Sequence, residues 1–202
     1  MALVTGASSG IGAAVARELA RQGAAVGLAA RRLDRLEEQA GEIRTAGGGA
    51  LPVVCDVSRD GDPDRAVAAV RDAFGPVSIV VANAGFGVSG RVDALTVQDF
   101  QRQYETNFFG VVRTVKASLE DLTATRGVLA VLGSVAGYFG APGQAPYCTS
   151  KAAVRVLAQS LWGELRPLGV GVVLVSPGYV ESEIRRRGPD GQLTEDPVPP
   201  WL

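Results

Sequence analysis

The chain has 202 residues, enough for one domain that buries a complete core without disulfides or metals, and we expect residues 1–202 to form a single domain. Its net charge of -1 gives no basic footprint for nucleic acid, so nucleic-acid partners are disfavoured. Histidine is absent, which excludes His-based catalysis and the common zinc sites, and we expect no metal site.

Hydrophobic residues make up 47% of the chain, yet no apolar run approaches the roughly 18 residues that span a membrane. The charged, apolar and small-residue pattern of a signal peptide does not precede the first expected strand. We therefore expect a cytoplasmic protein without a membrane partner.

A glycine-rich turn follows the first apolar run, residues 2–4, and opens into a helical pattern over residues 11–20. Glycines in such a turn permit tight backbone geometry and let a pyrophosphate approach main-chain N–H groups at a helix N-terminus. The glycine spacing is not G-x-G-x-x-G, and surface turns also use glycine, so a plain turn is the alternative. The residues of the expected cofactor-binding turn are Gly6, Ser8, Ser9, Gly10, Ile11 and Gly12.

Two arginines follow the second expected strand, which covers residues 23–30. An acidic residue at this place binds the ribose 2′-OH of NAD, whereas an arginine holds the 2′-phosphate of NADP. Arg31 and Arg32 stand there without an acid, and a guanidinium matches phosphate geometry, so the sequence predicts NADP over NAD. Alternatively the arginines, Arg32 especially, belong to a solvated helix start, with Asp34 as its cap or first-turn acid.

Strands and helices continue to alternate along the chain. A third strand over residues 50–55 closes with Asp56 and Val57, and Asp56 can accept from an adenine amino group or serve as a turn or cap residue. After a helix over 58–74 and a strand over 77–81 come Asn83, Ala84 and Gly85. Small residues there leave room for a flat cofactor, and Asn83 can brace the neighbouring turn or simply belong to a turn.

A long helix expected over residues 97–118 carries Asn107 among apolar side chains. An amide in such company must find hydrogen-bond partners, which a bend in the helix or a held water would supply. A fifth strand over 127–133 delivers Ser134 to its end, and a sixth over 169–176 ends in Pro177 and Gly178.

Tyr147 and Lys151 open the helix between these last two strands. Their i, i+4 spacing points the phenol and the ammonium to the same side. A tyrosine with its free pKa of about 10 is a poor base near neutrality, and a neighbouring ammonium favours the phenolate. With Ser134 on the substrate oxygen, the pair can move a proton during hydride transfer. Alone, the lysine can be a snorkelling surface residue and Ser134 a strand-end cap.

Taken in order, these motifs resemble those of the short-chain dehydrogenase/reductase family over nearly the whole chain. The resemblance rests on Thr5-Gly6-Ala7-Ser8-Ser9-Gly10-Ile11-Gly12, Asp56-Val57, Asn83-Ala84-Gly85, Asn107, Ser134, Tyr147 with Lys151, and Pro177-Gly178. It implies a Rossmann-like, doubly wound parallel α/β sheet and a catalytic tetrad of Asn107, Ser134, Tyr147 and Lys151. It also implies Arg31 as the main NADP phosphate contact, Asp56 and Val57 near adenine, and Pro177, Gly178 and Val180 near nicotinamide.

The end of the chain departs from the family pattern. Family members continue beyond the sixth strand with a substrate-covering segment, a helix and a final strand, whereas residues 183–202 are rich in proline. We expect six strands, with the family's C-terminal strand and helix missing, and a mobile substrate-side segment over 179–202. The resemblance also implies a homo-oligomer, a dimer through the helices that carry Asn107 and Lys151.

The sequence thus predicts an NADP-dependent oxidoreductase that reduces a carbonyl or oxidises a secondary alcohol. The alternatives are a nucleotide-binding relative without turnover and an epimerase or dehydratase that retains its cofactor. A mostly apolar substrate lining favours an uncharged ketone, and the arginines at 185–187 can bind an anion or form a solvated face. The expected substrate contacts are Phe86, Val135, Tyr138, Gln144 and Tyr179.

Overall fold

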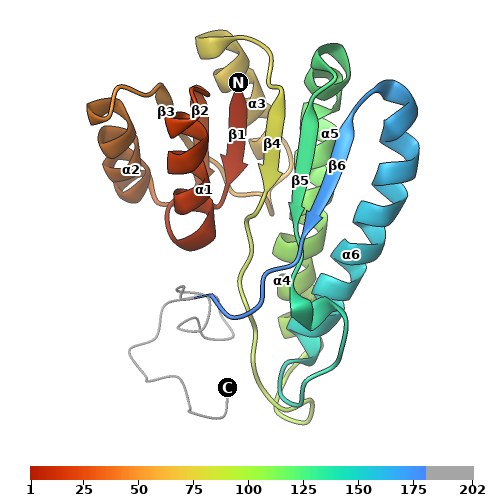
Figure 1. Ribbon diagram of the computed structural model, residues 1–202. Helices are drawn as coiled ribbons and strands as arrows, with labels where there is room; N and C mark the ends of the chain where they lie inside the picture. The colour runs from red at the N-terminus through yellow and green to blue at the C-terminus, as the bar shows by residue number, and fades with distance from the viewer. Residues whose placement is uncertain (181–202) are drawn as a thin grey trace.

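The computed structural model describes residues 1–180, and six parallel strands form one sheet within them (Figure 1). The strand order is β3-β2-β1-β4-β5-β6. The strands are β1 (Ala2–Thr5), β2 (Val26–Ala30), β3 (Ala50–Val54), β4 (Ile79–Ala82), β5 (Val128–Leu132) and β6 (Gly171–Val175). The sheet confirms the predicted Rossmann-like α/β fold. The predicted substrate-side segment lies, from residue 181 onward, outside the described residues, as do the arginines at 185–187.

Helices connect consecutive strands. They are α1 (Gly10–Arg21), α2 (Leu33–Thr45), α3 (Asp62–Phe74), α4 (Val97–Tyr104), the π-helical segment η1 (Glu105–Phe109), α5 (Gly110–Thr125), the 3-10 turn η2 (Val135–Gly137), α6 (Ala145–Leu165) and the 3-10 turn η3 (Arg166–Leu168). None of the helices in residues 1–180 combines the length and the apolar character needed to cross a membrane.

Two hydrophobic clusters cover the two faces of the sheet. On one face, side chains of α1 and α2 such as Ala16, Leu36 and Ile43 pack against Val4 and Leu28. On the other face, α3, α5 and α6 pack against the side chains of the strands that point the opposite way. Figure 1 shows α1 in front of the sheet and α3 and α5 behind it. Burial on both sides explains why β1 and β2 consist of apolar and small residues apart from Thr5.

The strand order reverses between β1 and β4, which pair in parallel beside each other. The chain winds from β1 towards β3 on one side and from β4 towards β6 on the other. In open α/β sheets the crevice at the carboxyl ends of the strands, at such a reversal, is where ligands bind. The segments that follow β1 and β4 therefore border the expected binding crevice.

Two predicted elements differ from the structure. The helix expected from residue 58 begins at Asp62, because the amide and hydroxyl of Ser58 donate to Asp56 Oδ1 and hold residues 56–58 in a turn. The helix expected over 97–118 is two α-helices joined by η1, and it continues to Thr125. The other predicted strands and helices agree with the structure to within a few residues at their ends.

Gly27 in β2 lets α3 approach the sheet closely, because a Cβ on this residue would lie 2.2 Å from Val70 Cγ2. We expect Gly27→Ala to lower the free energy of unfolding by about 2 kcal/mol through overpacking. Val70→Ala should cost about 2 kcal/mol by leaving a cavity. The two changes relieve each other, so urea denaturation of the double variant should show a loss about 1 kcal/mol or more below the sum. Strict additivity would contradict the close contact.

Candidate functional site

A cleft of about 740 Å³ lies over the carboxyl ends of the strands. The segment that follows each strand contributes lining residues, because the carboxyl ends of parallel strands lie at the same edge of the sheet. Most of the predicted site residues line this cleft: Gly6, Ser8, Ser9, Gly10, Ile11, Arg31, Arg32, Asp56, Val57, Asn83, Ala84, Gly85, Phe86, Ser134, Tyr147, Lys151, Pro177, Gly178 and Val180.

The turn between β1 and α1 is held in a conformation that requires glycine. Gly6 and Gly10 have φ of +68° and +56°, a region that disfavours residues with a Cβ. Gly12 does not line the cleft but lies behind the turn, where a Cβ would meet Gly6 O at 2.4 Å. The missing side chains leave the backbone of the turn open to a ligand at the N-terminus of α1.

Asn83 braces this turn from the end of β4, as the sequence suggested. Its Nδ2 donates to the carbonyl of Thr5 at 2.8 Å. In return, Thr5 Oγ1 accepts from the backbone N–H groups of Asn83 at 3.0 Å and Ala84 at 3.1 Å. These contacts tie the carboxyl ends of β1 and β4 together at the reversal of the strand order.

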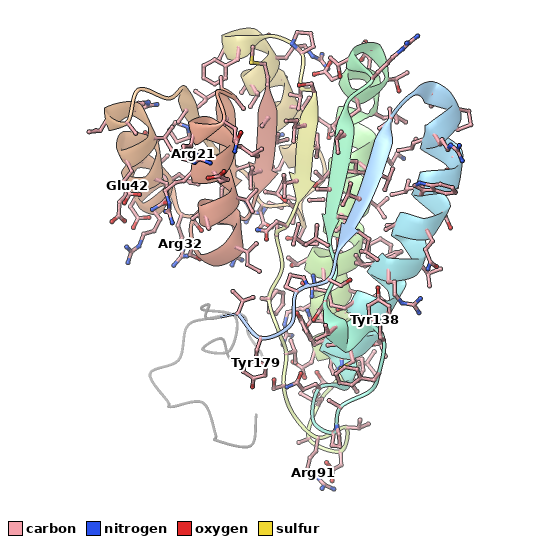
Figure 2. The ribbon with its side chains drawn as sticks, in the orientation of Figure 1. Arg21, Arg32, Glu42, Arg91, Tyr138 and Tyr179 are labelled. Carbon is pink, nitrogen blue, oxygen red and sulfur yellow. The ribbon has the colours of Figure 1, made fainter. Side chains whose placement is uncertain are left out.

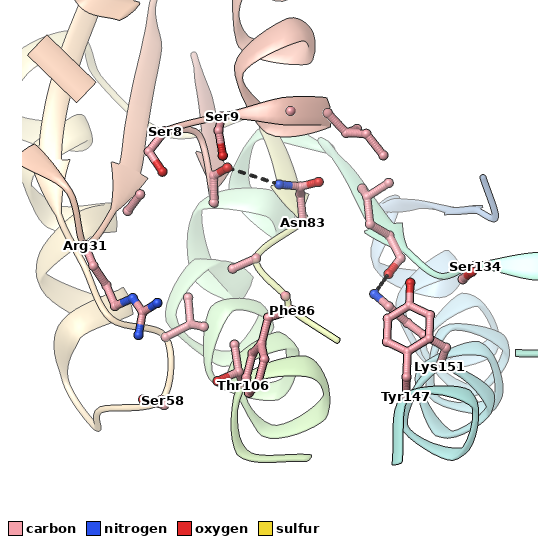
Figure 3. A pocket seen from close by; sticks show the side chains of 18 of the residues that line it. Ser8, Ser9, Arg31, Ser58, Asn83, Phe86, Thr106, Ser134, Tyr147 and Lys151 are labelled. Atoms are coloured by element: carbon pink, nitrogen blue, oxygen red, sulfur yellow. Dashed lines mark hydrogen bonds between the residues drawn. The ribbon is translucent and has the colours of Figure 1, made fainter. Parts of the chain in front are cut away.

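Both arginines after β2 line the cleft. Arg32 is half-buried and donates from its guanidinium to Ser9 Oγ at 3.0 Å and to Ser8 Oγ at 3.3 Å, so its side chain contacts the glycine-rich turn. Arg31 is exposed, and Figure 3 shows its guanidinium on the side of the cleft opposite Tyr147. Asp34 is an acid in the first turn of α2, which was one of its two predicted roles.

Asp56 and Val57 lie at the end of the cleft formed after β3. The Asp56 carboxylate accepts from the Ser58 hydroxyl at 2.6 Å and from the Ser58 N–H at 3.0 Å. The turn role that the sequence left open for Asp56 is therefore present. Its second oxygen lies 3.9 Å from Arg59 Nε.

Ser134, Tyr147 and Lys151 gather at the other end of the cleft (Figure 3). Lys151 Nζ lies 6.0 Å from the centroid of the Tyr147 ring and donates to the carbonyl of Leu132 at 2.8 Å. The Lys151 side chain is buried, and this burial lowers its pKa to about 8. Burial raises the pKa of Tyr147, and the hydroxyl of Ser134 acts in the opposite direction.

Asn107 belongs to η1 and does not line the cleft, unlike the other three predicted catalytic residues. Its amide finds its partners in the protein: Oδ1 accepts from the N–H of Phe86, and Nδ2 donates to the carbonyl of Phe86, both at 3.0 Å. Nδ2 also lies 3.3 Å from Ser150 Oγ, to which it donates. The buried amide thus joins η1 to the segment after β4 and to α6.

The predicted substrate residues are divided. Phe86 lines the cleft, whereas Val135, Tyr138, Gln144 and Tyr179 do not. Tyr138 and Tyr179 are 60% and 77% exposed and lie beyond the carboxyl ends of the strands on separate segments (Figure 2). The Arg155 guanidinium lies 5.0 Å from the centroid of the Tyr138 ring.

Several residues that line the cleft were not predicted from the sequence. They are Ala30, Cys55, Ser58, Arg102, Glu105, Thr106, Leu132 and Gly133. Arg102 and Thr106 have i, i+4 spacing, and Thr106 precedes Asn107, so the helix that was expected to carry Asn107 contained a signal for them. Within residues 1–180 no group of three or more acidic residues or cysteines could hold a metal ion.

Comparisons with known proteins agree with this geometry. The family model for short chain dehydrogenase matches residues 1–192. An uncharacterized oxidoreductase of Staphylococcus epidermidis is 37% identical over 183 residues, which cover 90% of this chain and 78% of the relative.

Two solved structures have the same fold. One is an alcohol dehydrogenase from Thermococcus sibiricus complexed with 5-hydroxy-NADP, with a TM-score of 0.87 and 36% identity, covering 97% of this chain and 81% of that one. The other is a short chain dehydrogenase/reductase from Burkholderia phymatum in complex with NAD, with a TM-score of 0.88 and 30% identity, covering 91% of this chain and 67% of that one. The chain belongs to the short chain dehydrogenase family of oxidoreductases.

Proposed function

We propose that the protein is an NADP-dependent enzyme that transfers a hydride between nicotinamide and a carbonyl or secondary alcohol. One observation carries the proposal: a single cleft joins the glycine-rich turn and Arg31 at one end to Ser134, Tyr147 and Lys151 at the other. Binding groups for a dinucleotide and proton-transfer groups thus face the same space.

The residues at the turn fit a dinucleotide. Gly6 and Gly10 have positive φ, and Gly12 has no Cβ, so backbone N–H groups at the N-terminus of α1 are accessible to a pyrophosphate. Arg31 and Arg32 follow β2, where an NAD-specific site would carry an acid. An exposed Arg31 guanidinium is suited to a 2′-phosphate, and Arg32 is suited to hold Ser8 and Ser9 in place.

The bound cofactor would supply or accept the hydride, and the chain would handle the proton. A phenol with the ordinary tyrosine pKa of about 10 is protonated near neutrality, and burial raises the pKa of Tyr147 further, so Tyr147 can donate to the oxygen of a carbonyl substrate. The Ser134 hydroxyl, in the same end of the cleft, can donate to that oxygen as well. The Lys151 ammonium favours the phenolate that remains after proton donation.

Asn107 takes a different part in this proposal from the other three residues. Its amide is occupied by Phe86 and Ser150 and does not line the cleft, so we assign it to positioning the main chain rather than to direct contact with substrate.

The expected homodimer and the cytoplasmic location stay predictions. A hollow lined by Phe108, Ala152, Ala153, Val156, Leu157 and Ser160 lies on the helices named for the dimer and supports contact with a second copy. Its lining is almost wholly apolar, and Val156 is 52% exposed.

The cofactor preference is tested by calorimetric titration with NADPH and with NADH. We expect NADPH to bind about tenfold or more tightly, because a charge-assisted hydrogen bond to the 2′-phosphate is made only by NADPH. Arg31→Ala should remove most of that difference. Arg35→Ala is the matched control. Arg35 pairs with Glu38 within α2, so its removal should leave the cofactor preference intact. Equal affinity of the natural chain for both cofactors would refute the NADP assignment.

The role of Tyr147 is tested with a carbonyl substrate found by screening for NADPH oxidation. Tyr147→Phe should lower kcat by about 100-fold or more while the Kd for NADPH changes little, because only proton transfer is lost. Tyr104→Phe, a tyrosine of α4 packed near Phe108, should retain activity. Turnover without net NADPH oxidation would favour a cofactor-retaining epimerase or dehydratase, and NADPH binding without any turnover would favour a non-catalytic relative.

The buried Lys151 ammonium makes stability depend on pH. Its pKa of about 8 in the folded state lies below the ordinary lysine value of about 10.4, so the unfolded chain binds more protons between these pH values. The free energy of unfolding should therefore rise with pH through this range. Relative to Lys151→Met, the natural chain should gain roughly 1 kcal/mol from pH 7 to pH 9. Lys116→Met, which removes the exposed second lysine, should show the same change in the free energy of unfolding from pH 7 to pH 9 as the natural chain.

A further inference from the structure

A second buried amide lies one helical turn before Asn107. The side chain of Gln103 in α4 is fully buried. Its Oε1 accepts from the N–H of Val88, and its Nε2 donates to the carbonyl of Phe86, both at 2.6 Å. Gln103 therefore binds the segment after β4 at two points, once as acceptor and once as donor.

Gln103 and Asn107 share the Phe86 carbonyl. Asn107 Nδ2 donates to the same oxygen at 3.0 Å, and its Oδ1 accepts from the Phe86 N–H. The two amides thus make four hydrogen bonds to the backbone of residues 86–88. They come from two different helical segments, α4 and η1, so the backbone of Phe86 and Val88 fixes the two segments relative to each other.

The network continues to the catalytic end of the cleft. Asn107 Nδ2 donates to Ser150 Oγ, and the Ser150 hydroxyl donates to the carbonyl of Tyr147 at 2.8 Å. Gly85 lies between the groups: a Cβ there would be 3.0 Å from Asn107 Oδ1 and 3.7 Å from Lys151 Nζ. A shift of the segment from Gly85 to Val88 would therefore disturb Asn107 and the first turn of α6 together.

An apolar side chain of the same size cannot replace Gln103 in this arrangement. Val88 is fully buried, so its N–H would lose its acceptor where water does not easily reach it. The Phe86 carbonyl would retain Asn107 alone. Residues 86–88 would then have to move to recover the lost hydrogen bonds. Asn107 would have to move with them or lose its hydrogen bonds to Phe86.

We infer that Gln103 is a positioning residue of the proposed reaction: it fixes the Phe86 to Val88 segment so that Asn107 and the first turn of α6 hold Tyr147 and Lys151 in register with the substrate. This inference rests on the proposed function. It assigns to Gln103 no contact with substrate or cofactor, since its side chain is absent from the lining of the cleft.

The test compares Gln103→Met with Asp121→Asn in the full chain. Asp121 is also buried, but its carboxylate binds Arg71 and the N–H of Val77 before β4, at the end of that strand remote from the cleft. We expect Gln103→Met to lower kcat about tenfold or more, with less than about a twofold change in the Kd for NADPH, because misplaced groups slow chemistry. Asp121→Asn should lower the melting temperature without lowering kcat.

Amide hydrogen exchange supplies a second measurement that does not need a substrate. In Gln103→Met the amides of Phe86 and Val88 should exchange faster than in the natural chain, and in Asp121→Asn they should not. If kcat and exchange at both amides are unchanged in Gln103→Met, the inference is overturned while the proposed function stands. If the natural chain turns over no carbonyl, the proposed function fails, and the positioning of Tyr147 and Lys151 for that reaction fails with it.

Discussion

The contact between the ends of β1 and β4 is the constraint on which the rest of the site depends. The Thr5 hydroxyl oxygen accepts from two N–H groups after β4, and the Asn83 amide donates back to the carbonyl of Thr5. Because the strand order reverses between these two strands, the chain diverges here and leaves a crevice. The same hydrogen bonds hold the glycine-rich turn against residues 83 and 84, so the turn and the segment that leads to Phe86 meet at one junction.

Buried polar side chains hold the segment that continues from this junction to Val88. Gln103, Asn107 and Ser150 are each fully buried and hydrogen-bonded to main chain or to each other. Such a network is favourable only when its members are satisfied together, which ties α4, η1, α6 and the segment after β4 into one arrangement. Lys151 differs from these residues because it carries a charge: its buried ammonium donates to a backbone carbonyl, and burial lowers its pKa. Burying this charge lowers the stability of the fold but places a titratable cation close to the Tyr147 ring.

The fold and much of the cleft could be predicted because their determinants are local. Apolar runs followed by glycine, asparagine or serine mark strand ends, and the carboxyl ends of parallel strands meet at one edge of a sheet. The contact of Arg32 with Ser8 and Ser9 could not be predicted, since it depends on how β2 is placed beside β1. Val135, Tyr138 and Tyr179 were expected in the cleft from their sequence positions, yet all three are exposed outside its lining. Neighbours along the chain do not determine which way a loop side chain points.

The π-helical segment shows most clearly why part of the site was not predictable. Helical periodicity assumes a constant turn, whereas η1 has a wider turn over Glu105–Phe109, so the direction of the Asn107 side chain could not be derived from that periodicity. The sequence correctly required partners for a buried amide but could not say that Phe86 and Ser150 would supply them. Nothing in the sequence indicated that Gln103 is buried, because a glutamine on a helix is ordinarily solvated. Its role becomes clear only in the structure, where the N–H of Val88, 15 residues earlier in the chain, belongs to no strand and has Gln103 as its acceptor. Backbone polar groups that leave regular structure inside a core must be satisfied by backbone, by side chains or by water. Here the side-chain amides of Gln103 and Asn107 satisfy them, next to the proposed catalytic groups.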